Sequence, residues 1–227
     1  MSLVSVILAV YNGEKYIEAA IESILEQTYT PIEILVINDG SKDDTEKTIQ
    51  KYLPKIRYFS RPHQGQPAAQ NFGISISTGS FLSFLDADDL HMPEKTFLQL
   101  QFLENKPEVD AVFGHVEQFF SPELSSIQKK QWIFPSGISP GYFASAALFR
   151  KKCFKTVGLF NEQQHIGVFI DWYMRSTEKG IISDVIPEKV LQRRIHENNM
   201  GISCKNSHLE YIKVVQNALK RRRHETR

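Results

Sequence analysis

The stretch Phe81-Leu-Ser-Phe-Leu-Asp-Ala-Asp-Asp89 is a short apolar run that ends in three carboxylates within four positions. Crowded carboxylates repel one another, so they need a compensating charge from a bound cation or from basic side chains. Alternation along an extended strand would place Asp86 and Asp88 on one face and Asp89 on the other. Because Mg²⁺ and Mn²⁺ are usually held by one or two carboxylates plus substrate phosphates, the pair favours a metal–diphosphate site.

A second interpretation of the same residues needs no ligand. Asp89 is followed by Leu90-His-Met-Pro-Glu94, so it could cap the helix that begins there. Asp86 would then be a solvated strand end. Taken alone, the stretch supports both interpretations equally.

Length and charge narrow the function classes. With 227 residues, the chain can bury a core as one larger domain. Its 27 basic and 26 acidic residues give a net charge of +1, so no nucleic-acid partner is expected. The exception is the run Lys220-Arg-Arg-Arg223, which is typical of a solvated helix end and alternatively offers a contact with anionic lipid. We therefore divide the chain into a domain over residues 1–205 and a basic C-terminal helix or tail over 206–227.

Cysteine usage points to a reducing compartment. Cys153 and Cys204 lie far apart and form no metal motif, which favours free thiols over a disulfide framework. No apolar run approaches the length needed to cross a bilayer. The expected location is cytoplasmic, with at most peripheral contact at the inner face of the membrane.

Apolar runs and helical periodicity alternate through the first half of the chain. The predicted strands are residues 3–10, 32–37, 56–59 and 81–89, and the predicted helices between them are 14–27, 43–52 and 65–77. This order argues for a single α/β domain with an open, mainly parallel central sheet and helices on both faces. Ligands bind outside the carboxyl ends of such strands, which places Tyr11, Asp39 and the three carboxylates along one edge.

The second half of the chain is less regular. The pattern predicts a helix over 94–104, a strand over 110–115, an irregular loop over 122–140, a helix beginning within 167–175, a strand over 189–196 and a basic terminal helix over 206–222. In the first half, Ser41 and Asp44 resemble a capping box for the second helix.

Motifs that would indicate other nucleotide-binding folds do not occur. The chain has no Gly-x-x-x-x-Gly-Lys-Ser/Thr loop, and the first turn lacks Gly-x-Gly-x-x-Gly. A nucleotide would therefore be held in another way.

Several motifs instead occur together along nearly the whole chain. They are Ser5-Val-Ile-Leu-Ala-Val-Tyr-Asn12, Ile37-Asn-Asp-Gly-Ser41, Asn71-Phe-Gly73, Phe84-Leu-Asp-Ala-Asp-Asp89, Gly158-Leu-Phe160, Asp171-Trp172 and Arg194-Ile-His196. In this order and spacing, they resemble family 2 glycosyltransferases with the GT-A fold, from Ser5 to about Asn199. The resemblance is specific for the family and says little about the substrate.

The resemblance assigns a nucleoside diphosphate sugar to the site. It implies that Tyr11 and Asp39 hold the base and ribose, and that Asn71 contributes to donor binding. Without it, strand-end packing would explain Tyr11, and an Asx turn before Ser41 would explain Asp39. It also implies that Asp86 faces the ribose or the sugar.

The resemblance also implies a divalent metal, Mn²⁺ or Mg²⁺, bound through Asp88 and His196. Arg194 and His196 lie two residues apart on a predicted strand and therefore share a face, as they must if both point at the diphosphate or the metal. Asp88 is the expected metal ligand, and Asp89 is the carboxylate expected to keep a capping role.

Asp171 matches the catalytic base of the family. A carboxylate near the acceptor hydroxyl can take its proton as the oxygen attacks the anomeric carbon, which inverts the configuration in one displacement. The alternative is an intrahelical ion pair with Arg175, four residues on. The apolar neighbours Phe169, Ile170 and Trp172 favour the catalytic role.

Three positions depart from the family pattern. Ala9 replaces a proline, Gln70 replaces an arginine before Asn71, and Ile170 replaces the glutamate before the base. The last two changes remove charges from the expected pocket.

The leading hypothesis is a metal-dependent inverting glycosyltransferase that acts on a nucleoside diphosphate sugar, with a UDP-sugar favoured. The expected acceptor is a saccharide or lipid-linked hydroxyl in surface polysaccharide or glycolipid biosynthesis. One rival is a non-catalytic relative that binds nucleotide sugars. A weaker rival is a sugar-1-phosphate nucleotidyltransferase, for which Tyr11-Asn-Gly-Glu-Lys15 is a poor substitute for the required Gly-rich basic loop. The sequence does not indicate the oligomeric state.

Overall fold

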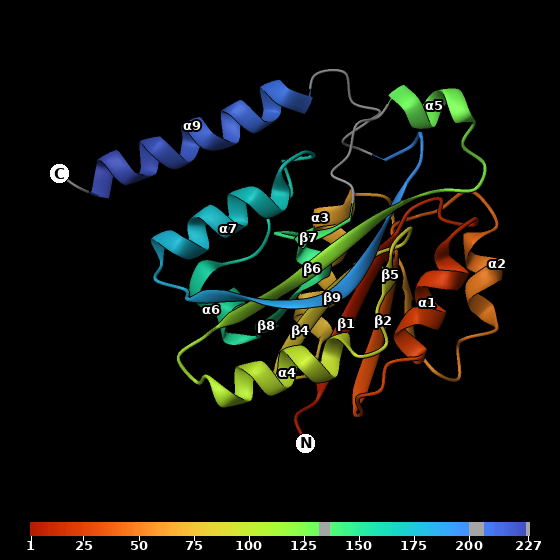
Figure 1. The fold of residues 1–227 in the computed structure, drawn as a ribbon, viewed down its shortest axis with the longest axis horizontal. Helices are drawn as coiled ribbons and strands as arrows, with labels where there is room; N and C mark the ends of the chain where they lie inside the picture. The colour runs from red at the N-terminus through yellow and green to blue at the C-terminus, as the bar shows by residue number, and fades with distance from the viewer. Residues whose placement is uncertain (132–136, 200–206, 226–227) are drawn as a thin grey trace.

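The computed structural model describes residues 1–131, 137–199 and 207–225. In this part of the chain, nine strands form one mixed sheet with the order β3-β2-β1-β4-β8-β6-β9-β5, and β7 pairs with β6 outside this path. Helices cover both faces of the sheet (Figure 1). Cys204 and residues 132–136 of the predicted loop lie outside the described residues.

The first half of the chain forms the parallel part of the sheet. Its elements are β1 (Val4–Val10), α1 (Ile17–Leu25), β2 (Ile32–Asn38), α2 (Thr45–Gln50), β3 (Arg57–Ser60), α3 (Gln66–Ile76) and β4 (Phe81–Asp86). β1 pairs in parallel with both β2 and β4, and β2 pairs in parallel with β3. The predicted alternation of strands and helices is therefore confirmed.

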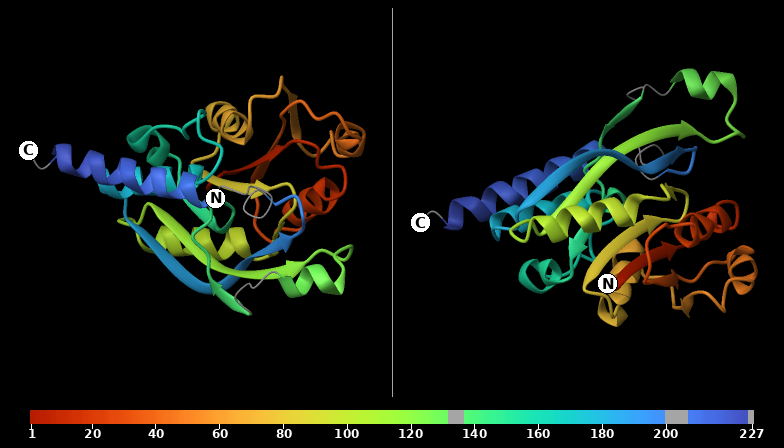
Figure 2. Two further views of the ribbon diagram at one scale, coloured as in Figure 1. Left: turned by 90° about the horizontal axis from the view of Figure 1, so that it is seen from above. Right: turned by 60° about the horizontal axis from the view of Figure 1, so that its bottom comes forward.

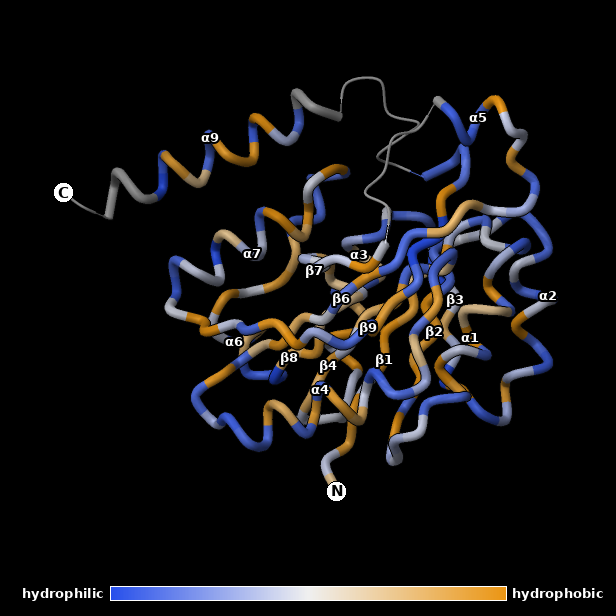
Figure 3. The backbone as a smooth tube through the Cα atoms, in the orientation of Figure 1, coloured by the Kyte–Doolittle hydropathy of each residue, from blue (hydrophilic) through white to orange (hydrophobic). Residues whose placement is uncertain are grey.

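β1 lies at the centre of this half and is buried on both faces. Val6 and Leu8 belong to the apolar core under α1, α2 and α4, whereas Ile7 and Ala9 belong to the core under α3, α6 and α7. A Cβ atom on Gly73 would lie 2.5 Å from Ile7 Cγ2, so only glycine lets α3 pack this closely on the strand. Figure 3 shows apolar residues concentrated along the central strands.

The second half of the chain completes the sheet. Its elements are β5 (Leu90–His91), α4 (Lys95–Asn105), β6 (Ala111–Phe120), α5 (Ser126–Gln131), β7 (Ile138–Pro140), a 3₁₀ turn (Ala144–Ala146), β8 (Ala147–Arg150), α6 (Lys152–Val157), α7 (Val168–Glu178), β9 (Ser183–Ile195) and α9 (Ser207–Glu225). β8 runs antiparallel between β4 and β6, while β6 and β9 are parallel to each other. The predicted irregular loop over 122–140 is wrong in part, because it contains α5 and β7.

The C-terminal helix α9 lies alongside α7 (Figures 1 and 2). Val214 and Ala218 are buried at this contact. Gly167, which precedes α7, has a φ of +70°, and a Cβ atom there would lie 3.2 Å from the Tyr211 ring. No helix in the described ranges combines the length and the apolar character that spanning a membrane requires.

Two local expectations meet different outcomes. The predicted capping box is wrong: Ser41 Oγ accepts a hydrogen bond from Asn12 N instead, and Asp43 Oδ1 accepts from Thr45 N at the start of α2. Cys153 is a free, fully buried thiol that donates to the Asp110 carbonyl, and burial raises its pKa to about 12.

Candidate active site at the carboxyl ends of the strands

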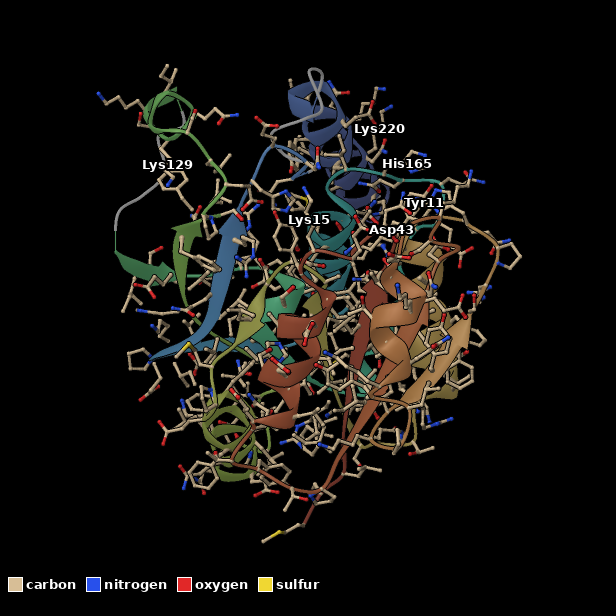
Figure 4. All side chains as sticks on the ribbon, turned by 90° about the vertical axis from the view of Figure 1, so that its right-hand side faces the viewer. Tyr11, Lys15, Asp43, Lys129, His165 and Lys220 are labelled. Atoms are coloured by element: carbon tan, nitrogen blue, oxygen red, sulfur yellow. The ribbon has the colours of Figure 1, made fainter. Side chains whose placement is uncertain are left out.

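All the polar residues predicted to bind the donor, except Asn71, lie at one end of the sheet. β1 ends at Val10 and β4 ends at Asp86, and the two strands are parallel neighbours. Figure 4 shows Tyr11, Lys15 and Asp43 together at this end of the molecule, above the strands. This is the crevice position in which open α/β sheets bind ligands.

Asp86 is the last residue of β4 and is held by two side chains. Gln66 Nε2 donates to Oδ1 at 2.6 Å, and Ser145 Oγ donates to Oδ2 at 3.0 Å. Desolvation, together with the negative charge of Asp88, raises the pKa of Asp86 to about 6. The carboxylate is therefore fixed in place and surrounded by negative potential.

Asp88 lies in the turn after β4 and contacts residues that follow β9. Its Oδ2 atom is 2.8 Å from His196 Nε2 and accepts a hydrogen bond from Asn199 Nδ2 at 3.1 Å. The structure therefore joins Asp88 and His196, the two predicted metal ligands. Asn199 is an addition that the sequence reasoning missed, although its position three residues after His196 was a usable signal.

Asp89 does not cap α4, and this correction has a clear cause. Its side chain is buried, and Oδ1 accepts a hydrogen bond from the backbone N–H of Arg194 at 2.8 Å. The N-cap position of α4 is Glu94 instead. Burial raises the pKa of Asp89 well above its usual value, and the charges of Asp88 and Asp86 add to this effect.

Arg194 also reaches this cluster. Its Nε atom donates to the Asp88 carbonyl at 3.0 Å, and its guanidinium carbon lies 4.7 Å from the Tyr16 ring centre and 4.6 Å from that of Phe119. Within the described residues, no hydrogen bond engages its Nη1 or Nη2 atom. The guanidinium thus has two terminal donors left for an anionic ligand.

The donor atoms in this cluster fit a hard divalent ion. Asp88 and His196 offer one carboxylate and one imidazole. Burial is the main cause that raises the pKa values of Asp86 and Asp89, and the charges of neighbouring carboxylates add to it, an effect that a bound cation would oppose. In residues 1–131, 137–199 and 207–225, no three His, Cys, Asp or Glu side chains form a group able to hold a metal by themselves. Substrate oxygens or water would have to supply the remaining ligands.

Tyr11, His63 and Asp39 form a second cluster at the same end. The Tyr11 and His63 rings stack with centroids 4.0 Å apart, and His63 Nδ1 lies 2.8 Å from Asp39 Oδ2. Asp39 is buried and also accepts from the backbone N–H groups of Gln64 at 3.0 Å and Gly65 at 2.8 Å. The Asx turn considered for Asp39 is made by its neighbour Asn38, whose Oδ1 accepts from Ser41 N.

Asn71 is not brought to the carboxylates. Its buried amide pairs with both backbone groups of Phe160, at 3.0 Å each, and with Glu162 Oε1 at 2.8 Å. Asn71 therefore fixes the loop before α7 to α3, the helix whose first residue, Gln66, holds Asp86.

Asp171 lies in the first turn of α7, apart from these clusters. Its Oδ2 atom is 2.9 Å from Arg175 Nε, which is the intrahelical pair considered from the sequence, and its Oδ1 atom is 3.2 Å from Arg221 Nη1 on α9. Ile170 is 38% exposed, so the surroundings of Asp171 are less apolar than its neighbours in sequence suggest. Asp171 lines a cavity of about 600 Å³.

The cavity beside Asp171 is formed by α7, α9 and the loop before α7, and most of the side chains around it are polar or charged. It is lined by Leu159, Asn161, Gln164, Asp171, Arg175, Asn217, Lys220 and Arg221. Arg221 belongs to the basic run that the sequence assigned to solvent, and this assignment is wrong for Arg221. No local signal could have paired it with Asp171, fifty residues earlier.

The sequence also matches known proteins. The profile described as Glycosyl transferase family 2 covers residues 5–174. The chain belongs to glycosyl transferase family 2. This finding confirms the resemblance carried by the motifs.

Relatives in this family cover much of the chain. An uncharacterised glycosyltransferase of Rickettsia typhi is 32% identical, over 96% of this chain and 72% of the relative. One of Rickettsia conorii is 35% identical, over 71% of this chain and 29% of the relative. The chain therefore spans less than a third of some family members.

Solved structures share the fold. S. aureus TarS 1-349 in complex with UDP-GlcNAc has a TM-score of 0.74 at 17% identity, over 96% of this chain and 65% of TarS 1-349. The mannosyltransferase PcManGT from Pyrobaculum calidifontis in complex with GDP-Man and Mn²⁺ has a TM-score of 0.64 at 20% identity, over 86% of this chain and 58% of PcManGT. At these identities the likeness concerns the fold alone, and it confirms the expected single-domain GT-A architecture.

Proposed function

We propose that this family 2 member transfers a sugar from a nucleoside diphosphate sugar to an acceptor hydroxyl. One observation carries the proposal: Asp88, His196 and Arg194 converge where β4 and β9 end. A carboxylate, an imidazole and a guanidinium with two available donors match the needs of a diphosphate and its counter-ion.

The donor would extend across the carboxyl end of the sheet. Tyr11, stacked on His63, supplies a flat surface for the base, and Asp39 organises the loop beside it. Asp86 faces the ribose or sugar, where its carboxylate can accept hydroxyl hydrogen bonds. Arg194 donates to the diphosphate. Asn71 supports this arrangement from behind, through the Phe160 loop.

The cofactor would be Mn²⁺ or Mg²⁺. Asp88 and His196 would hold it, with oxygens of the diphosphate as further ligands. When bound, such an ion neutralises the charge that develops on the departing nucleoside diphosphate. The mannosyltransferase PcManGT, which shares the fold, was solved in complex with GDP-Man and Mn²⁺, and this supports the proposal of a divalent metal.

Asp171 would act as the general base of an inverting transfer. Each carboxylate oxygen carries two lone pairs, so the pairs with Arg175 and Arg221 leave each oxygen able to accept a hydrogen bond from an acceptor hydroxyl, the first step toward taking its proton. The cavity beside it offers amide and basic groups to a saccharide or lipid-linked acceptor. Such an acceptor fits a role in surface polysaccharide or glycolipid biosynthesis.

The decisive experiment is a thermal-shift and calorimetric screen of UDP-, GDP-, dTDP- and CDP-sugars, with and without Mn²⁺. One base should stabilise the protein only in the presence of metal. We favour uracil, because TarS was solved in complexes with UDP and UDP-GlcNAc. Asp88→Asn should abolish the metal-dependent stabilisation by the nucleotide sugar. Asp44→Asn should not change this stabilisation, because the Asp44 side chain is 73% exposed. Absence of binding by every nucleotide sugar would contradict the proposal.

One structural observation favours the second candidate, a non-catalytic binder of nucleotide sugars. Both carboxylate oxygens of Asp171 already contact arginines. Donor turnover separates the two functions. Metal-dependent binding with neither transfer nor slow donor hydrolysis, over a broad acceptor panel, would support the binder.

A further inference from the structure

Tyr16 lies where three elements meet beside the proposed diphosphate site. It occupies the N-cap position of α1, and its ring centre is 4.7 Å from the Arg194 guanidinium carbon. The centroid of the Tyr16 ring also lies 5.0 Å from the centroid of the His196 ring, with an angle of 41° between the two ring planes. One aromatic ring therefore contacts both basic residues at the end of β9.

The Tyr16 hydroxyl is anchored on a third element, the segment that follows β6. It donates to Glu123 Oε1 and lies 3.3 Å from Ser121 Oγ. Ser121 is fully buried, and its backbone N–H donates to the Ile195 carbonyl at 2.9 Å, between Arg194 and His196. The hydroxyl and the two basic residues thus belong to one connected structure. Figure 4 shows Lys15, which precedes Tyr16, and Lys129 on α5 at this same end of the molecule.

This arrangement restricts how Arg194 can move. Its guanidinium lies against the Tyr16 ring and the Phe119 ring, both within 5 Å of its carbon atom, while Nε is bound to the Asp88 carbonyl. Rotation of the guanidinium would break the Nε bond or lose the contact with the rings. Nη1 and Nη2 are therefore held in one direction before any ligand arrives, which lowers the entropy cost of binding an anion.

We propose that Tyr16 is a positioning residue for the diphosphate, because it holds Arg194 and His196 in their binding orientation and is itself held by Glu123 and Ser121. The proposal rests on the proposed function, in which Arg194 and His196 meet the diphosphate and its metal. It goes beyond that function by making the segment after β6 part of the site. Burial and the Glu123 carboxylate both raise the pKa of Tyr16, so the hydroxyl keeps its proton for this contact.

Two substitutions separate the roles of the ring and the hydroxyl. Tyr16→Leu removes the ring and should weaken Mn²⁺-dependent binding of UDP, or of GDP if the screen selects guanine, by about tenfold or more. Tyr16→Phe keeps the ring and removes the hydroxyl, so it should weaken the same Mn²⁺-dependent nucleotide binding by about threefold. Binding of the nucleoside alone should stay unchanged in both, because Tyr11 and His63 contact the base elsewhere. The matched control is Tyr52→Phe, whose hydroxyl donates to Glu22 at 2.9 Å and is predicted to have no effect.

A second measurement needs no ligand. In the metal-free protein, imidazole ¹⁵N shifts should report a single His196 tautomer, fixed by the contact of Nε2 with Asp88. Tyr16→Leu should produce a mixture of tautomers, and Tyr52→Phe should not. If the wild type binds UDP but Tyr16→Leu binds it equally well and keeps one tautomer, the positioning role is wrong while the proposed function stands. If the wild type binds no nucleotide, the proposed function fails, and the tautomer measurement still decides whether Tyr16 orients His196.

Discussion

Asp171 Oδ1 lies 3.2 Å from Arg221 Nη1, so the C-terminal helix contacts the carboxylate that the family motif designates as the base. The family match ends at residue 174, and α9 begins at Ser207. Arg221 also pairs with Glu178 at the other end of α7, with Nε 2.9 Å from Oε2. A segment beyond the family match thus completes the surroundings of Asp171.

The first prediction concerns the docking of α9. Arg221→Gln should remove the guanidinium that pairs with Asp171 and with Glu178, whose side chain is 6% exposed. We expect a loss of about 1–3 kcal/mol in the free energy of unfolding and faster hydrogen exchange throughout α9. Lys213→Gln is the control, because Lys213 is exposed and pairs with Glu210 within the same helix. Equal exchange of α9 in the wild type and Arg221→Gln would show that the ion pairs do not hold the helix.

The second prediction concerns the base. Asp171→Asn keeps the shape of the side chain but cannot take a proton, so kcat for transfer should fall by about 10²- to 10⁴-fold. Nucleotide affinity should stay unchanged, because Asp171 lies apart from the donor residues. Glu178→Gln provides the control, since it also weakens the Arg221 bridge without altering Asp171. Full transfer by Asp171→Asn, measured with a true acceptor, would remove Asp171 as the base.

The third prediction concerns Asn71. Asn71→Ala would leave the N–H and carbonyl groups of Phe160 without partners in a buried place. We expect a loss of about 1–3 kcal/mol in unfolding free energy. Donor affinity, measured by calorimetry well below the melting temperature, should change little, because the amide supports the site indirectly. Asn161→Ala, at an exposed position in the same loop, is the matched control. A selective loss of donor affinity at unchanged stability would instead indicate direct contact with the donor.

The fourth prediction concerns a fully buried lysine. Lys95 Nζ donates to Ser83 Oγ at 3.0 Å, Gln99 Oε1 at 2.8 Å and the Ala147 carbonyl at 3.1 Å, and none of these three partners is charged. Desolvation lowers its pKa from 10.5 to about 7. Between these two values the unfolded chain binds more protons than the folded protein, so this group makes stability rise with pH from about 7 to about 10.5.

Urea denaturation at pH 6.5 and pH 9 would test the fourth prediction. Lys95→Met removes the buried charge. The free energy of unfolding of the variant minus that of the wild type should therefore be larger at pH 6.5 than at pH 9. Taking the difference cancels the contribution of groups that do not interact with Lys95; the nearby His91, whose pKa is lowered by burial and by the Lys95 charge, does not cancel fully. Lys47→Met, at a side chain that is 79% exposed, should show no such dependence. A difference that does not vary with pH would show that Lys95 keeps its charge across this range.

The sequence predicted best where structure is local. The first four strands and their helices appear at the expected positions because strand burial and helical periodicity are properties of neighbouring residues. The position of β8 between β4 and β6 depends on contacts between distant segments, which periodicity does not encode. The same limit explains Asp89. The sequence predicted that it caps the helix that follows it, but its side chain accepts a hydrogen bond from the backbone N–H of Arg194, 105 residues away.

The sequence named several residues of the candidate site but anticipated few of their contacts. The motifs grouped Asp88 and His196 as metal ligands, and the structure brings these two side chains together, because family resemblance carries information about distant pairs. Tyr16 and Arg221 were missed, since a tyrosine before a helix and an arginine in a basic run have ordinary local explanations. Asn71 was expected near the donor, yet its amide serves the Phe160 loop.

The separation of Asp88 from His196 by 108 residues also has a consequence for synthesis on the ribosome. A nascent chain exposes the crowded carboxylates after β4 long before the imidazole that contacts them has been translated. The outer edge of β4 is likewise unpaired until β8 emerges, more than sixty residues later. Exposed strand edges promote association between chains. The emerging polypeptide is therefore vulnerable to aggregation in this interval, before the two halves of the proposed metal site can meet.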